Sequence, residues 1–154
     1  MNMMNTDLKL DLEFGCKNGR NGRYHPEKTK IILYGILKGL QVIHSNQLIH
    51  RDLKPGNILL GMSETMGVKV QICDFGMSST QHKTNGGSNS ITPMDSRYVV
   101  TRMYRPPEII LESPNQTCAI DMFSVGCIFA EMLFAEQDPP QSRRLFGADS
   151  SCSR

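Results

Sequence analysis

The sequence predicts a mainly α-helical fold with one small β hairpin, α+β overall. Apolar residues recur at helical spacing between residues 26 and 46, and residues 119–134 are apolar on nearly every face. Between these segments, residues 58–60 and 68–72 are short runs rich in Ile, Leu and Val, as is typical of strands.

Local signals along the chain predict each element. Residues 15–25, GCKNGRNGRYH, are rich in Gly, Asn and basic residues, so they predict a loop. Pro26 then suits the first turn of a helix. The apolar positions of this amphipathic helix are Leu33, Ile36, Leu37, Leu40 and Ile43. The turn-forming sequence GMSETMG joins the two strands, and the apolar helix over 119–134 belongs in the middle of a domain.

Composition excludes several classes of protein. At 154 residues, the chain suits one domain with a core of its own. Its formal net charge of +2 is too small to indicate nucleic acid or an anionic membrane as the main partner. There is no apolar run of about 18 residues that would span a membrane, and the N-terminus lacks the basic start and apolar block of a signal peptide. The five cysteines form no CxxC pair, which argues against zinc and disulfides and favours a reduced, cytoplasmic or nuclear protein.

Two polar segments contrast with the apolar ones. Residues 77–97 contain Gly86-Gly87 and many Ser and Thr, and they cannot bury enough apolar surface to order themselves. They predict a flexible loop. A hydroxyl-rich loop at this position also fits a phosphorylation switch, and the two interpretations are compatible. Residues 135–154 form a polar tail that we expect to be mobile.

The most informative residues lie between His50 and Gly76. The segment from His50 to Asn57 reads HRDLKPGN and the segment from Asp74 to Gly76 reads DFG, with a strand-like run between them. Together they supply two carboxylates, an amide and an ammonium, which are the groups that phosphoryl transfer from ATP requires. The alternative is a surface loop with incidental charges, but the order and spacing of the two motifs favour a site.

Three further segments extend this pattern. Residues 98–108 read YVVTRMYRPPE, residues 121–127 read DMFSVGC and residues 4–8 read MNTDL. They resemble YVATRWYRAPE, DMWSVGC and METDL of the mitogen-activated protein kinases, a branch of the eukaryotic protein kinases. The resemblance covers residues 4–134.

The resemblance implies a partial kinase domain, mainly the central part of the large, C-terminal lobe. Residues 1–134 would form this part, from the end of the hinge to a central helix, and residues 135–154 would form the tail. The glycine-rich loop, the strand lysine and the helix glutamate of a small lobe are not in the sequence, so we expect a truncated site. Met103 and Phe123 stand where the family has tryptophan, and each loses an indole N–H.

The resemblance also implies catalytic roles. Asp52 would accept or orient the proton of the substrate hydroxyl, and Lys54 would place a charge near the transferring phosphate. Asn57 and Asp74 would hold Mg²⁺, which suits one amide oxygen, one carboxylate, water and phosphate. Thr101 would link Asp52 and Lys54 on the substrate side.

Nucleotide contacts and packing residues are implied by the same comparison. Met4 and Asp7 would contact the hinge side and the ribose of ATP, and Leu59 would pack under the adenine ring. An untethered N-terminal strand is the alternative for Met4 and Asp7. His50 and Phe75 are expected to pack under the site rather than to take part in chemistry.

Regulation by phosphorylation is the next implication. Ser96 and Tyr98 would be phosphorylated by an upstream activating kinase. Arg51, Arg102 and Arg105 would receive the phosphates, because the guanidinium fork matches phosphate oxygens. A solvated loop arginine is the alternative for Arg51.

Two further residues have open roles. Asp121 is expected to cap the apolar helix, and the resemblance implies that it also accepts hydrogen bonds from the backbone of the HRDLKPGN loop. The carboxylate of Glu108 would lack its usual arginine, so we expect its surroundings to be exposed.

Two functions therefore remain open. The first is an ATP- and Mg²⁺-dependent protein Ser/Thr kinase of the mitogen-activated type, acting on proline-directed sites in protein substrates. The second is a non-catalytic, kinase-derived module that binds partners or acts as a dominant negative. We expect little or no phosphotransfer from the 154-residue chain by itself.

Overall fold

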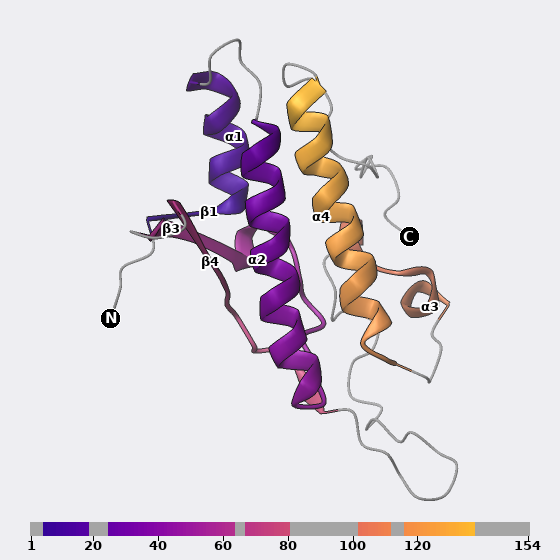
Figure 1. The fold of residues 1–154 in the computed structure, drawn as a ribbon. Coiled ribbons are helices and arrows are strands. Elements are labelled where there is room, and N and C mark those ends of the chain that lie inside the picture. The colour runs from indigo at the N-terminus through magenta and orange to yellow at the C-terminus, as the bar shows by residue number, and fades with distance from the viewer. Residues whose placement is uncertain (1–4, 19–24, 64–66, 81–101, 112–115, 138–154) are drawn as a thin grey trace, which may run out of the picture.

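Two long helices, α2 (Pro26–Ser45) and α4 (Ala119–Gln137), run side by side through the fold (Figure 1). The computed structural model describes residues 5–18, 25–63, 67–80, 102–111 and 116–137. Within these ranges the fold is α+β with small antiparallel sheets, as predicted. No helix of the described residues is long and apolar enough to cross a membrane.

Helix α2 confirms the helix predicted over residues 26–46, but its buried face differs in part, because Leu37 is exposed and Leu33 is only half-buried. His25 precedes the helix, and its Nδ1 accepts from the Glu27 N–H at 3.2 Å. Pro26 follows at a position where a missing N–H has no cost, and Glu27 adds a negative charge near the positive end of the helix dipole. The buried positions repeat at helical spacing and are Thr29, Ile32, Ile36, Leu40 and Ile43.

The predicted hairpin is present and is longer than expected. Strand β3 (Ile58–Ser63) pairs antiparallel with β4 (Gly67–Ile72), from Ile58 opposite Ile72 to Ser63 opposite Gly67. The ends of the GMSETMG sequence therefore belong to the strands. A short strand, β1 (Thr6–Asp7), adds to the other edge of β3.

The hairpin packs against α2 through two glycines of the helix. A Cβ atom on Gly35 would lie 2.6 Å from Val70 Cβ, and one on Gly39 would lie 3.0 Å from Ile72 Cδ1. Because neither glycine carries a side chain, β4 approaches the helix backbone closely. Figure 1 shows the result, with α2 between the hairpin and α4.

Helix α1 (Leu8–Asn18) corrects part of the predicted loop over 15–25. Residues 15–18 are helical, and residues 19–24 lie outside the described residues. Asp7 directly precedes the helix and caps it, because its Oδ1 accepts from the Leu10 N–H at 2.9 Å. Leu8 and Leu12 are buried one turn apart, so tertiary packing outweighs the loop-like composition of the segment's end.

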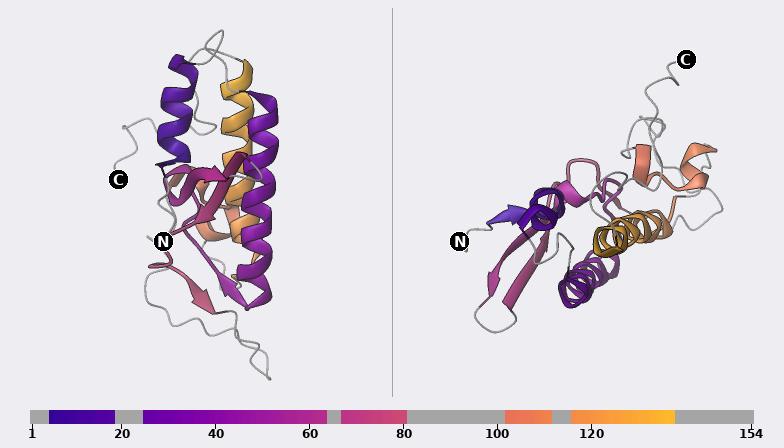
Figure 2. Two further views of the ribbon diagram at one scale, coloured as in Figure 1. Left: turned by 60° about the vertical axis from the view of Figure 1, so that its left-hand side comes forward. Right: turned by 90° about the horizontal axis from the view of Figure 1, so that it is seen from above.

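Short elements complete the described fold. Strand β2 (Leu48–Ile49) pairs antiparallel with β5 (Ser79–Thr80), and η2 (Pro55–Asn57) leads into β3. The turn η3 (Arg102–Tyr104) and the helix α3 (Pro107–Ile110) lie on the opposite side of α4 from α2 (Figure 2). Ile110 and Leu111 beside Glu108 are exposed, as expected for this corner, whereas Glu108 itself is half-buried.

Helix α4 confirms the predicted helix over 119–134 and continues to Gln137. It is buried on one side only, although its sequence is apolar on nearly every face. The buried side packs on α2, α1 and η3. Met122, Leu133 and Phe134 are exposed. The buried residues include Ile120, Val125, Ile128, Met132 and Ala135.

Candidate active site

The HRDLKPGN loop runs from the end of β2 to the start of β3, and Asp121 of α4 anchors its beginning. The N–H groups of His50 and Arg51 donate to the two carboxylate oxygens of Asp121 at 2.8 and 2.9 Å. Asp121 is fully buried. The expectation that it accepts from the loop backbone is confirmed. It is not the helix cap, because Thr117 Oγ1 accepts from the Ala119 N–H instead.

His50 is a structural residue, as expected, because both ring nitrogens are used inside the protein. The Asp52 N–H donates to Nδ1 at 3.3 Å, and Nε2 lies 3.0 Å from the Cys73 carbonyl oxygen, which can only accept. This arrangement fixes the Nε2–H tautomer. The ring also packs on Phe75, with 5.0 Å between ring centroids. His50 therefore joins the loop to the segment that carries DFG.

Three of the predicted site residues meet: Lys54, predicted as catalytic, and Asn57, predicted as a metal ligand, both contact Asp52. Lys54 Nζ donates to Asp52 Oδ2 at 2.6 Å, and Asn57 Nδ2 donates to the Asp52 carbonyl at 2.8 Å and to its Oδ2 at 3.3 Å. Asp52 and Asn57 are buried, and Lys54 is half-buried. Because the side-chain nitrogen Nδ2 of Asn57 donates here, the side-chain oxygen Oδ1 is the atom left for a cation.

The hairpin register brings Asp74 to the same end as Asn57. The Cys73 N–H donates to the Asn57 carbonyl at 3.0 Å, one residue beyond the last strand pair. Asp74 follows with a left-handed backbone, φ 66°, and is exposed. Burial raises the pKa of the Cys73 thiol, and the neighbouring charge of Asp74 raises it further. Cys73 therefore acts as a small packing residue at this junction.

Arg51 is buried to 8% exposure and has a left-handed backbone, φ 69°. Burial lowers the pKa of its guanidinium, while the Asp121 charge raises it, and Nε has no hydrogen-bond partner among the described residues. The alternative of a solvated loop arginine is therefore wrong. Arg105 is half-buried just after η3, and of Arg102 only the backbone is described. A shared phosphate-receiving role stays a prediction.

Of the expected nucleotide contacts, Asp7 and Leu59 lie directly opposite each other in the sheet formed by β1 and β3. Leu59 is half-buried. Asp7 already caps α1 with one carboxylate oxygen, so it has a structural role in addition to any ligand contact. Four other predicted site residues lie outside the described ones: Met4, Ser96, Tyr98 and Thr101.

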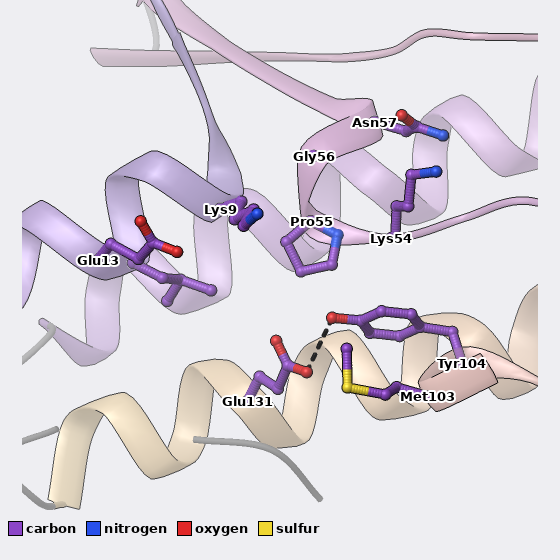
Figure 3. A pocket seen from close by; sticks show the side chains of 10 residues that line it. Lys9, Glu13, Lys54, Pro55, Gly56, Asn57, Met103, Tyr104 and Glu131 are labelled. Atoms are coloured by element: carbon purple, nitrogen blue, oxygen red, sulfur yellow. Dashed lines mark hydrogen bonds between the residues drawn. The ribbon is translucent and has the colours of Figure 1, made fainter. Parts of the chain in front are cut away.

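A pocket of about 410 Å³ opens beside the loop, and Figure 3 shows its walls. Lys54 and Asn57 stand at one edge, while Tyr104 and Glu131 face them from η3 and α4. The Tyr104 hydroxyl donates to Glu131 Oε1 at 2.9 Å. Asp7 and Leu59, the described residues predicted to contact nucleotide, do not line the pocket, whereas the predicted metal ligand Asn57 does. Its other walls are Lys9, Leu12, Glu13, Pro55, Gly56 and Met103.

Sequence reasoning missed His44, Tyr104 and Glu131. His44 Nε2 lies 2.8 Å from Asp121 Oδ2, so it contacts the same carboxylate as the loop backbone. The signal that would have found it is its place on α2, four residues after buried Leu40 on the apolar face. Tyr104 and Glu131 are far apart in sequence, and no local pattern joins them.

These contacts agree with the comparison to known proteins. The family model described as "Protein kinase domain" matches residues 1–145. This chain belongs to the protein kinase family. The described residues therefore form part of a protein kinase fold.

Curated relatives and solved structures give the same family. Mitogen-activated protein kinase 1 of Oryza sativa subsp. japonica is 40% identical over 131 residues, covering 85% of this chain and 28% of the rice protein. Mitogen-activated protein kinase 13 of Arabidopsis thaliana is 46% identical over 110 residues, covering 71% of this chain and 27% of that protein. The kinase chain therefore spans less than a third of the length of these relatives.

A solved structure also matches the kinase fold. A chain in the "Crystal Structure of the yeast RNA Pol II CTD kinase CTDK-1 complex" superimposes with a TM-score of 0.69 at 26% identity. The match covers 86% of this chain and 38% of the other.

Proposed function

We propose that the chain carries the catalytic-loop part of a protein Ser/Thr kinase of the mitogen-activated type. It would belong to the large lobe and would act on Ser or Thr in proline-directed protein sites. The observation that supports this most is the cluster in which Lys54 and Asn57 both donate to Asp52. A surface loop with incidental charges would not bury Asp52 and Asn57 together.

The cluster suits positioning rather than strong base catalysis. Asp52 would orient the substrate hydroxyl and accept its proton, because attack on a loose phosphoryl transition state depends mainly on alignment. Lys54 would hold the Asp52 carboxylate in place and supply positive charge at the transferring oxygens. Thr101 would complete the substrate side.

The donor set near the loop fits magnesium and ATP. The side-chain oxygen Oδ1 of Asn57 and the exposed carboxylate of Asp74 are hard oxygen ligands at the same end of the hairpin. Bound Mg²⁺ would neutralise charge on the ATP phosphates. Met4, Asp7 and Leu59 would contact the nucleoside, and the pocket in Figure 3 would accept a side chain of the protein substrate.

Control by an upstream kinase would complete this function. Phosphates on Ser96 and Tyr98 would pair with Arg51, Arg102 and Arg105. Buried Arg51, whose Nε has no partner among the described residues, supports an anionic ligand at this point.

A non-catalytic binding module is the second candidate. The apolar side chains of Ile110, Leu111 and Met122 are exposed, which favours contact with a partner. The 154 residues also contain no Gly-x-Gly-x-x-Gly loop to cover the phosphates.

Two phosphotransfer assays separate the candidates. We expect the purified 154-residue chain, given Mg²⁺-ATP and a Ser-Pro peptide, to transfer little or no phosphate. Turnover that Asp52→Asn abolishes would refute this expectation.

A chimera tests the proposed site directly. Residues 5–137 would replace the matching segment of the rice kinase, to which the chain is 40% identical. We expect the chimera to phosphorylate the peptide and Asp52→Asn to lower kcat by at least about 10²-fold. A folded chimera without activity would favour the binding module.

A further inference from the structure

We propose that Lys28 and Thr29, at the start of α2, are positioning residues that fix the distance between α1 and α4, and with it the width of the pocket beside the HRDLKPGN loop. The inference rests on the proposed function, because it treats this pocket as the place for a side chain of the protein substrate. Neither residue lines the pocket, so both would act through the helices that do.

The pocket lies between α1 on one side and η3 and α4 on the other (Figure 3). Lys9 and Glu13 belong to the α1 wall, and Tyr104 and Glu131 belong to the opposite wall. These walls come from segments far apart in the sequence. The width of the pocket therefore depends on how α1 is placed relative to α4.

Helix α1 is held at two places. At its beginning, β1 pairs with β3 and Asp7 caps the helix. Further along, Asp11 Oδ1 accepts from Lys28 Nζ of α2 at 2.6 Å. The Asp11 side chain is 15% exposed and that of Lys28 is 33% exposed, so salt screens this ion pair less than a fully exposed one. Because Asp11 lies between Lys9 and Glu13 on α1, the ion pair places the part of the helix that forms the pocket wall.

The next residue of α2 makes the corresponding contact with α4. Thr29 is 2% exposed, and its hydroxyl donates to Glu136 Oε1 at 2.5 Å. Glu136 lies in the last turn of α4, where the negative end of the helix dipole disfavours a carboxylate. A donor from another helix therefore stabilises Glu136 at this position. The contact places the same end of α4 that carries Glu131 of the pocket.

One turn of α2 thus connects both walls, because Lys28 and Thr29 are neighbours in sequence. Figure 1 shows the start of α2 and the ends of α1 and α4 at the same end of the fold. Loss of either contact would let one wall move relative to the other, and a substrate side chain would fit less closely. The contacts around Asp52 lie within the loop itself and would persist. We therefore expect substrate binding to weaken while the chemical step continues.

Kinetics of the chimera separate this role from general destabilisation. Lys28→Met keeps the apolar stem and removes the charge, and Thr29→Val keeps the shape and removes the hydroxyl. We expect each to raise the KM for the Ser-Pro peptide about fivefold and to leave kcat and the KM for ATP within about twofold. Lys28→Arg keeps the charge, so its KM for the peptide should stay within about twofold of the unmodified chimera.

Lys38→Met is the matched control, because Lys38 is a lysine of the same helix whose described contacts, to Gln41 and Tyr34, lie within α2. It should change neither KM nor kcat. An unchanged KM for the peptide in Lys28→Met or in Thr29→Val would overturn the proposal. An equal rise in Lys38→Met would overturn it too, as would a fall in kcat at constant KM.

Amide hydrogen exchange of the 154-residue chain tests the same link without phosphotransfer. In Lys28→Met, the Leu12 and Glu13 amides should exchange about fivefold faster, while amides in the middle of α2 stay within about twofold. Lys28→Arg and Lys38→Met should exchange as the unmodified chain does. Equal acceleration throughout α2 would indicate general destabilisation and would overturn the proposal. If the expected pattern holds but the chimera is inactive, the proposed function fails and the link from α2 to the pocket wall stands.

Discussion

Arg51 and Asp74 share an uncommon backbone, and neither could be assigned it from sequence. Their φ angles are 69° and 66°. Asp tolerates the left-handed region better than Arg, which gains no local hydrogen bond from its side chain there. The HRDLKPGN and DFG motifs indicated which residues lie together. The left-handed backbone of Arg51 depends instead on a buried partner from elsewhere in the chain, Asp121.

Removing the Asp121 carboxylate should be costly. In Asp121→Ala, the buried N–H groups of His50 and Arg51 lose their acceptor, and each unsatisfied group costs about 1–3 kcal/mol. We therefore expect the free energy of unfolding to fall by about 3 kcal/mol in urea titrations followed by circular dichroism.

Glu27→Ala is the control for that measurement. It also removes a carboxylate with a charged partner, Lys30 at 2.8 Å, but both side chains are well exposed. Exposed pairs of this kind contribute little, so the urea midpoint should hardly move. Equal midpoints for the two variants would show that Asp121 is not a buried anchor.

At the level of elements, a strong repeat of apolar residues was enough to predict a helix or strand, whereas a weak repeat was not. The apolar repeat of α2 and the strand pair β3–β4 were predicted with nearly the right ends. Helix α1 was missed because Gly15 and Asn18 made its end read as a loop. The Asp7 cap and the spacing of Leu8 and Leu12 were available signals.

The contact between α2 and β4 depends on Gly35. A Cβ there would lie 2.6 Å from Val70 Cβ, so Gly35→Ala must displace the strand. Overpacking lowers the free energy of unfolding by about 1–3 kcal/mol. The better helix propensity of Ala raises it by about 1 kcal/mol. We therefore expect the free energy of unfolding, measured in urea, to fall by about 1 kcal/mol.

Gly39→Ala is the matched control in the same helix. Its Cβ would meet only the end of the Ile72 side chain, at 3.0 Å, which can move. It should cost less than Gly35→Ala. A double-mutant cycle with Val70→Gly should give a favourable coupling of about 1 kcal/mol or more. No coupling would mean that the close approach of the two backbones is not what Gly35 permits.

For the molecule as a whole, the sequence motifs indicated the cluster around Asp52 but not the contacts between helices that support it. The cluster that we propose to be catalytic lies within residues 52–57, so its members meet through local geometry. The contacts of His44 and Asp121, and of Tyr104 and Glu131, join separate elements. Such pairs follow from how the helices pack, and neither residue of a pair carries a local pattern that identifies its partner.

One core extends across the described elements, which bears on how the chain unfolds. Buried residues of α1, α2, β3, α3 and α4 belong to a single hydrophobic cluster, with Val70 and Ile72 of β4 packed against it. We therefore expect one cooperative urea transition. Helical circular dichroism at about 222 nm and the NMR intensities of β3 and β4 amides should share one midpoint, with a slope of about 1–3 kcal/mol/M.

Loss of the hairpin signals at lower urea than the helical signal would contradict a single core. That result would also have a functional meaning, because Asn57 and Asp74 stand at the end of the hairpin while Asp121 belongs to α4. Coincident transitions would mean that the proposed catalytic cluster, Asp121 and the expected metal ligands share the stability of the whole fold. A substitution that weakens one element, such as Gly35→Ala, would then destabilise the site only by lowering the global free energy of unfolding.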